Sequence, residues 1–343
     1  MQYYDGTKLL SLKDKNGNVP EIYISTSNRS AGKTTYFNRY LINRFKKHNE
    51  KFMLLYRFNY ELDNCADKFF KEIKSLFFPD DIMTSNKRQK GVYHELFLND
   101  VSCGYAVSIN SADNIKKLSH FFADTVTMLF DEFQSETNNY CSNEVEKFIS
   151  IHTSVSRGGG KQVRRVPVIM ISNHVTLLNP YYTALDISSK LQNDTVYLKG
   201  NGFVLEQGFN ESVAKKQKES AFNSAFENSD YMSYNTEKVY LNDNSTFIEK
   251  VSGKNRYLAT IKYNGKDFAI REYAEQGVVY CDENVDSTYP YKIAVTTDDH
   301  NINYVILKQN EPYIALLRYF FEHGCFRFKN LECKKAILML LSR

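Results

Sequence analysis

Residues 25–35 read Ser-Thr-Ser-Asn-Arg-Ser-Ala-Gly-Lys-Thr-Thr, and the Gly-Lys-Thr in this stretch is typical of loops that bind nucleotide phosphates. The overlapping segment 21–26 (EIYIST) is rich in apolar and β-branched residues, which predicts a buried strand. Apolar residues recur at helical spacing from Lys33 to Phe45, which predicts a helix directly after the loop. Backbone N–H groups and the positive end of the helix dipole then point at phosphate. We expect contacts from Ser27, Asn28, Arg29, Ser30, Ala31, Gly32, Lys33, Thr34 and Thr35.

Four side chains of this loop have separate expected roles. Lys33 reaches the β- and γ-phosphates, and the Thr34 hydroxyl is a ligand for Mg²⁺. Ser27 stands where the pattern has its first glycine, and we expect the turn to tolerate this small residue. Arg29 can neutralise the charge that develops on the γ-phosphoryl oxygens in the transition state. The alternative for Arg29 is an exposed loop arginine without a role.

Two further apolar segments end in polar residues that suit ATP hydrolysis. VTMLF (126–130) ends in Asp131 and Glu132, which we expect to hold Mg²⁺ through water and to polarise the attacking water, respectively. VPVIMIS (166–172) ends at Asn173, a candidate contact for the γ-phosphate or that water. Solvated strand ends are the alternative for each. The carboxyl ends of parallel strands meet at one edge of the sheet, so we expect these polar residues to lie beside the phosphate loop. This placement favours a site for ATP hydrolysis over solvated strand ends.

A basic, glycine-rich segment follows the helix that we expect over residues 143–156. It contains Arg157, Lys161, Arg164 and Arg165 around three glycines. Such a segment can reach the ATP of a neighbouring subunit or a DNA backbone. A solvated run of charges is the equally simple alternative.

The order of these segments predicts two domains. Strands that alternate with helices predict an α/β domain with a mostly parallel sheet over residues 1–200, an ASCE-type P-loop ATPase fold. Residues 208–235 are polar and rich in Ser, Asn, Glu and Lys, so we expect a linker or a connecting helical segment over residues 201–236. Short alternating segments, an Asn264–Gly265 hairpin signal and two final helices predict a smaller α+β domain over residues 237–343.

Composition excludes some classes of function. A net charge of +4 over 343 residues is too small to indicate nucleic-acid binding by itself. Six scattered cysteines without zinc spacing suggest reduced thiols in a cytosol. No apolar run approaches the roughly 18 residues of a membrane-spanning helix, so we expect no membrane partner.

The chain resembles the DNA-encapsidation ATPases of small tailed phages that prime replication with a protein, which are relatives of terminase large subunits. The matching segments keep the same order along the chain: NRSAGKT (28–34), FMLLYR (52–57), MLFDEF (128–133), ISNHVTLLNPYY (171–182), IKYNG (261–265) and AVTTDD (294–299). The resemblance implies a motor that uses ATP and Mg²⁺ to move double-stranded DNA into a prohead. It implies a ring, usually a pentamer, on the portal vertex in the host cytoplasm, and a packaging RNA in some members.

The resemblance also assigns residues. It gives Lys33, Thr34, Arg29, Asp131, Glu132 and Asn173 the roles named above, and it makes Arg157 an arginine that acts across the subunit boundary.

The resemblance further implies that the second domain has the RNase H-type fold of terminase nucleases without cutting activity. A two-metal nuclease needs several converging carboxylates. In RYLATIKYN (256–264) the candidate positions hold Lys262 and Tyr263, and Asp298 and Asp299 lack that partner. We expect no nuclease activity, and we expect contacts with DNA, RNA or portal from Lys250, Lys254, Arg256, Lys262 and Lys266.

Two other functions fit parts of the sequence. A monomeric P-loop kinase or small GTPase needs a nucleoside or guanine pocket, and the chain has no Asn-Lys-x-Asp motif. A module that binds ATP without hydrolysing it has no need for Glu132. The residues themselves favour an ATPase, whereas the DNA and the prohead follow from the resemblance alone.

Overall fold

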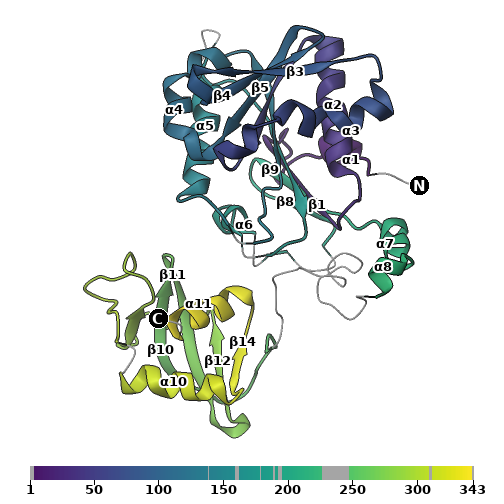
Figure 1. Cartoon of the computed structure of the whole chain (residues 1–343). Helices are drawn as coiled ribbons and strands as arrows, with labels where there is room; N and C mark the ends of the chain where they lie inside the picture. Colours follow the sequence, from purple (N-terminus) through teal and green to yellow (C-terminus); the bar gives the residue numbers. More distant parts are fainter. Residues whose placement is uncertain are drawn as a thin grey trace. The chain divides into compact units, whose positions relative to one another are not determined.

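The computed structural model describes residues 4–137, 139–158, 162–177, 179–187, 190–191, 195–225, 247–308 and 311–341 (Figure 1). The chain divides into two compact units, each discontinuous in sequence. The first comprises Met1–Ala184 with Leu191–Asn242, and the second comprises Leu185–Lys190 with Asp243–Arg343. Among the described residues, no helix is both long enough and apolar enough to span a membrane.

The first unit is built on a nine-stranded sheet with the order β3-β4-β5-β2-β6-β7-β1-β9-β8. Neighbouring strands from β5 to β9 in this order pair in parallel, whereas the pairs at the two edges are antiparallel. The mostly parallel sheet is therefore confirmed. The strands are β1 (Ile22–Ser27), β2 (Lys51–Tyr56), β3 (Met83–Arg88), β4 (Tyr93–Leu98), β5 (Val101–Ser108), β6 (Thr125–Asp131), β7 (Val168–Asn173), β8 (Tyr197–Lys199) and β9 (Phe203–Gln207).

Helices lie on both faces of this sheet (Figure 1). The pair α2 (Lys33–His48) and α3 (Cys65–Phe77) packs on one face, and α5 (Glu144–Val155) packs on the other. The remaining α-helices of the unit are short: α1 (Thr7–Ser11), α4 (Ala112–Lys117), α6 (Pro180–Ala184), α7 (Glu211–Lys218) and α8 (Ala221–Ser224).

The alternation of side chains along β6 determines the direction in which the Asp131 side chain points at the end of the strand. Leu129 is buried in the core with α2 and α3, whereas Phe130 turns to the other face, with its ring centroid 6.2 Å from that of Phe148 on α5. Because side chains alternate with a period of two, Asp131 shares the face of Leu129. Core packing thus directs the Asp131 side chain towards the start of α2.

The first sheet extends further along the chain than the sequence predicted. β9 pairs with β1, with Ile22 opposite Phe203 and Thr26 opposite Gln207. The prediction that residues 201–236 form a linker is therefore wrong for β9, whose five residues carry no turn or helix signal and are all buried. The end of that predicted linker and the first strand expected after residue 237 fall in residues 226–246, outside the described residues.

The second unit has a five-stranded sheet with the order β13-β10-β11-β12-β14. β10, β11 and β12 form an antiparallel meander, while β13 is parallel to β10 and β14 is parallel to β12. Asn264 and Gly265 have φ values of 50° and 76°, as the predicted Asn-Gly hairpin turn requires. The elements are β10 (Arg256–Tyr263), β11 (Lys266–Tyr273), β12 (Val278–Asp282), β13 (Lys292–Ala294), β14 (Phe326–Phe328), α10 (Pro312–Glu322) and α11 (Leu331–Leu341).

Candidate nucleotide site

The predicted phosphate loop joins the end of β1 to the start of α2. Ser27 is the last residue of β1, and Lys33 is the first residue of α2. Gly32 caps the helix with φ 96° and ψ 16°, a left-handed conformation that glycine adopts without the penalty of a Cβ atom. Ser30 also has a positive φ, of 62°. The chain therefore makes the sharp turn that the motif requires, although Ser27 replaces the first glycine of the pattern.

The lysine of the loop is bonded to the loop itself. The Lys33 Nζ atom donates to the Ser27 hydroxyl at 2.5 Å and lies 3.5 Å from the carbonyl oxygens of Ser27 and Asn28. The side chain is buried, and burial lowers the pKa of Lys33 to about 8, although the charges of Asp131 and Glu206 act in the opposite direction. The Ser27 side chain, which replaces the first glycine of the phosphate-loop pattern, thus supplies a bonding partner for Lys33.

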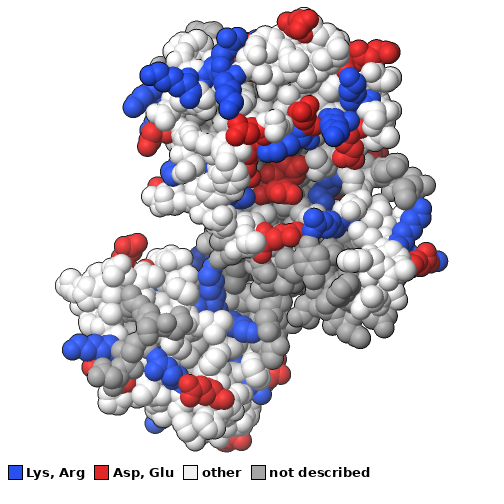
Figure 2. Space-filling view, viewed as in Figure 1, with Lys and Arg blue, Asp and Glu red and all other residues white. Residues whose placement is uncertain are grey.

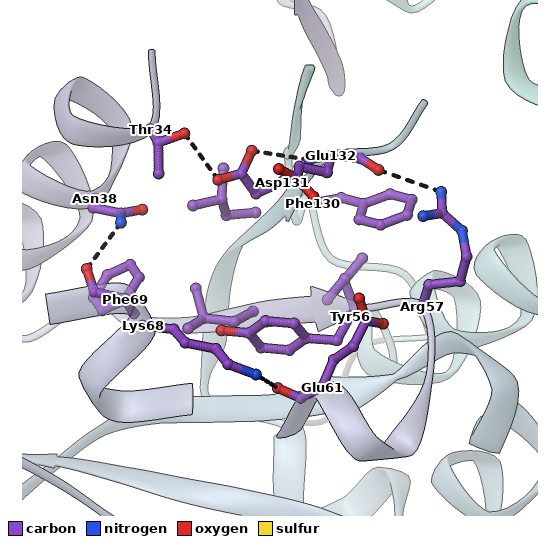
Figure 3. A pocket seen from close by; sticks show the side chains of 13 residues that line it. Thr34, Asn38, Tyr56, Arg57, Glu61, Lys68, Phe69, Phe130, Asp131 and Glu132 are labelled. Carbon is purple, nitrogen blue, oxygen red and sulfur yellow. Dashed lines mark hydrogen bonds between the residues drawn. The ribbon is translucent and has the colours of Figure 1, made fainter. Parts of the chain in front are cut away.

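A hydroxyl and a carboxylate meet where the sequence predicts a metal. The Thr34 Oγ1 atom donates to Asp131 Oδ2 at 2.9 Å, and Asp131 Oδ1 accepts from the Glu132 backbone N–H at 2.8 Å (Figure 3). Burial and then the charge of Glu132 raise the pKa of Asp131 to about 6. The Thr34 hydroxyl and the Asp131 carboxylate both offer hard oxygen ligands, which Mg²⁺ prefers.

The two residues cannot complete such a metal site by themselves. Among the described residues, no group of three or more His, Cys, Asp or Glu side chains is arranged to hold a metal ion. Mg²⁺ typically uses one or two protein ligands and takes the remaining oxygens from water and substrate phosphates. Thr34 and Asp131 therefore fit a metal that arrives with a nucleotide.

Glu132 lines two cavities on this edge of the sheet. One, of about 340 Å³, also contains Thr34 and Asp131 and extends to the end of β2 and to α3 (Figure 3). The other, of about 330 Å³, also contains Arg29 and Asn173. Glu132 has a φ of 55°, and a left-handed conformation costs a non-glycine residue about 1–3 kcal/mol. The structure therefore brings five predicted residues around one strained turn.

Arg29 and Asn173 reach their cavity from neighbouring elements. Ser27 at the end of β1 lies opposite Asn173 at the end of β7, so that the loop and Asn173 are level in the sheet. The Arg29 Nη1 atom is 3.7 Å from Glu136 Oε1, in the segment that follows β6. The arginine of the loop thus faces a carboxylate within the same cavity.

Arg157 lies near the start of β6, at the opposite end of the strand from these residues. It is exposed and follows α5, and a Cβ atom on the next residue, Gly158, would lie 2.7 Å from the Ala123 Cβ atom, just before β6 begins. Arg164 of the same segment donates to the Thr125 carbonyl oxygen at 3.1 Å. The seven residues of β6 separate the two ends of the strand by roughly 20 Å. Arg157 is thus remote from its own loop, and Lys161 lies outside the described residues.

A third cavity lies on the β9 side of the loop, and the sequence did not predict it. This cavity, of about 550 Å³, is lined by Ser27 and Ala31 of the loop and by Tyr4, Glu206 and Phe209. The buried Glu206 carboxylate accepts from the Tyr4 hydroxyl at 2.5 Å and from the Tyr197 hydroxyl at 3.0 Å. A glutamate within the apolar segment FVLEQ (203–207) was the available signal.

Replacing Ser27 with alanine should strengthen nucleotide binding. A hydrogen bond to a charged group contributes about 1.5–3 kcal/mol, and the predicted contact of Lys33 with phosphate would require this bond to Ser27 to break. We expect Ser27→Ala to bind ATP about tenfold more tightly in calorimetric titrations, whereas Ser154→Ala, which removes a hydroxyl on α5, should bind like the wild type. Unchanged or weaker binding by Ser27→Ala would contradict this role.

Comparisons with known proteins cover the whole chain. The family described as Podovirus DNA encapsidation protein (Gp16) matches residues 1–343. The DNA packaging protein of Bacillus phage phi29 is 24% identical over 307 residues, covering 88% of this chain and 87% of that protein. That of Bacillus phage B103 is 23% identical over 308 residues, covering 88% and 90%.

The fold is similar to that of a solved motor protein. A chain of the bacteriophage phi29 viral genome packaging motor assembly superposes with a TM-score of 0.73 at 24% identity, covering 100% of this chain and 99% of that one. This likeness concerns the fold, whereas the family match concerns the sequence from end to end. With the loop and its facing carboxylate in place, the chain belongs to the podovirus DNA encapsidation protein (Gp16) family.

Proposed function

We propose that this chain is the ATPase of a phage DNA-packaging motor, which binds Mg·ATP at residues 27–35 and couples its hydrolysis to movement of double-stranded DNA. Family membership supports the DNA packaging. One observation supports ATPase activity most strongly. The Thr34 hydroxyl, at the start of the helix that follows the loop, lies 2.9 Å from the Asp131 carboxylate at the end of β6.

Each residue of the site has a proposed part in hydrolysis. Lys33 would exchange its bond to Ser27 for the β- and γ-phosphates, and Thr34 and Asp131 would hold Mg²⁺. Bound there, Mg²⁺ would neutralise charge on the phosphate oxygens. Glu132 orients water and accepts its proton, with Arg29 and Asn173 in the same cavity close to the γ-phosphoryl group.

The third cavity suits the base and ribose of the nucleotide. It lies on the β9 side of the loop, whereas the carboxylates of the metal site lie on the β6 side, so a triphosphate bound across the loop directs its nucleoside there. Phe209 and Tyr4 offer aromatic rings, and Glu206 offers a hydrogen-bond acceptor. We propose that these residues hold adenosine.

Arg157 has no access to its own site, which supports a role in the neighbouring subunit. We propose a ring of identical subunits, in the pentameric form that the family resemblance implies, in which Arg157 of one subunit reaches the ATP of the next. An arginine supplied in this way stabilises transition-state charge. Its exposed position at the edge of the sheet agrees with this role.

We propose that the second unit is RNase H-like and does not cut DNA. The β12-β11-β10-β13 order, with an antiparallel meander and a parallel fourth strand, agrees with that fold. Lys262, at a candidate position for a first carboxylate, carries an ammonium group, and its Nζ atom lies 3.4 Å from Asp267 Oδ1. Asp299 is buried and accepts from the backbone N–H groups of Asn264 and Gly265, which makes it a turn residue.

The proposed partners are double-stranded DNA, the portal of the prohead and, as in some relatives, a packaging RNA. In the view of Figure 2, Lys and Arg side chains lie in several separate groups rather than one continuous strip. Arg256 is paired with Glu272 at 2.7 Å, and Lys266 with Glu332 at 3.2 Å. Of the predicted contact residues, Lys250 and Lys254 are the exposed ones that make no ion pair within the part of the chain that the structure describes.

Hydrolysis should require Glu132 and should respond to DNA. We expect double-stranded DNA to increase ATP turnover by the wild type, and Glu132→Gln to lower turnover at least 100-fold while still binding ATP, because it loses the proton acceptor alone. Glu146→Gln, an exposed position on α5, is the matched control. Hydrolysis of ATP by Glu132→Gln at the wild-type rate would refute the mechanism. A wild-type turnover that does not change with DNA would indicate an ATPase that is not coupled to DNA.

Mixed rings test whether Arg157 acts across the boundary. Arg157→Ala should bind ATP like the wild type, because the phosphate loop of each subunit is unchanged. Its turnover should fall at least tenfold, because each ATP site lacks the arginine of the neighbouring subunit. Mixing it with Glu132→Gln, which still donates Arg157, should restore part of the turnover. The absence of rescue at every mixing ratio would exclude the trans role.

A further inference from the structure

The turn that presents Glu132 is held by a buried arginine that the proposed mechanism does not use. Arg57 follows β2 directly, and its side chain is only 8% exposed. Its Nη2 atom donates to the Phe133 carbonyl oxygen at 2.8 Å. The same atom donates to the Glu132 carbonyl oxygen at 3.3 Å (Figure 3). One guanidinium group therefore bonds the carbonyl oxygens of two successive peptides, on either side of Phe133.

A second residue fixes the orientation of this arginine. The Arg57 Nε atom donates to Glu144 at 2.9 Å and 3.1 Å, and the Glu144 side chain is 1% exposed. Glu144 also accepts from the Tyr181 hydroxyl and from the Cys141 backbone N–H, each at 2.9 Å. Because Glu144 begins α5, the network ties the end of β2, the turn after β6 and the start of α5 together.

Aromatic rings and backbone contacts confine Arg57 further. Its guanidinium carbon lies 5.0 Å from the ring centroid of Tyr140 and 5.6 Å from that of Phe130. The Arg57 carbonyl oxygen accepts from the Ser108 hydroxyl at 3.1 Å and from the Asn110 backbone N–H at 3.2 Å. Neither end of the residue can shift without breaking several of these contacts.

The left-handed backbone of Glu132 explains why such a support is needed. A φ of 55° is unfavourable for glutamate, and without support the turn would relax and move the carboxylate. A general base must be held close to its productive position, and small displacements reduce rates strongly. We propose that Arg57, oriented by Glu144, is a positioning residue that holds Glu132 in place for hydrolysis. This inference rests on the proposed role of Glu132.

Arg57→Lys tests this role while keeping the buried charge opposite Glu144. An ammonium group lacks the planar fork that serves a carboxylate and two carbonyl oxygens together. In the full-length protein with double-stranded DNA, we expect kcat for ATP to fall at least 30-fold, with the dissociation constant of ATP within threefold of wild type. Arg44→Lys is the matched control, because it alters a bidentate Arg–Glu pair remote from the site and should turn over like the wild type.

A double variant separates positioning from a general loss of structure. If Arg57 acts through Glu132, adding Arg57→Lys to Glu132→Gln should change the residual rate of phosphate release less than twofold. Glu144→Gln, which keeps an acceptor of the same shape, should lower kcat in the same direction by a smaller factor. It carries the test if Arg57→Lys does not fold.

Specific outcomes would overturn the inference. A folded Arg57→Lys with kcat within threefold of wild type would do so, as would an unchanged kcat for Glu144→Gln. Weaker ATP binding in place of a lower kcat would instead show direct contact with the nucleotide. A full further loss in the Glu132→Gln background would show that Arg57 acts independently of Glu132. Wild-type hydrolysis by Glu132→Gln alone would refute the proposed function itself, which keeps the two failures distinct.

Discussion

A single hydrogen bond, from the Thr34 hydroxyl to the Asp131 carboxylate, joins the start of α2 to the end of β6. Its two residues lie 97 positions apart in sequence, and only the parallel sheet brings them together. Leu129 and Asp131 share one face of β6, so the same packing that buries the core against α2 and α3 also aims the carboxylate. The site thus depends on the register between β6 and the strands beside it.

The site balances charges that are costly to bury. Lys33 is buried and bonded to its own loop, while Asp131 resists ionisation because of burial and the neighbouring Glu132. A metal and phosphates that arrive together would satisfy both groups at once, because the cation pairs with Asp131 and the anion pairs with Lys33. Arg57 and Glu144 are already paired with each other and keep the turn in one conformation. Lys33 and Asp131 are thus suited to binding the ligand, and Arg57 and Glu144 are suited to positioning Glu132.

Local patterns in the sequence predicted the loop, the β6 and β7 ends and the Asn264–Gly265 hairpin, because each rests on neighbouring residues. The edge strand β3 (MTSNKR) was missed because it is polar, and β8 and β14 were missed because each has only three residues. The bonds of Arg57 to Glu144 and of Tyr4 to Glu206 span 87 and 202 positions. No periodicity or motif reports such pairs, so the support of the site emerged only from the fold.

If Asp131 holds a nucleotide-bound metal, the effect of Mg²⁺ on nucleotide binding should depend on its carboxylate, and calorimetry can measure that dependence. Binding of a slowly hydrolysed ATP analogue should be measured with and without Mg²⁺ for the wild type and Asp131→Asn. The control is Asp124→Asn, which changes an aspartate just before β6 begins, at the opposite end of the strand. We expect Mg²⁺ to strengthen binding at least tenfold in the wild type and the control, and we expect Asp131→Asn to lose this gain. A full Mg²⁺ response in Asp131→Asn would show that the Asp131 carboxylate does not hold the metal.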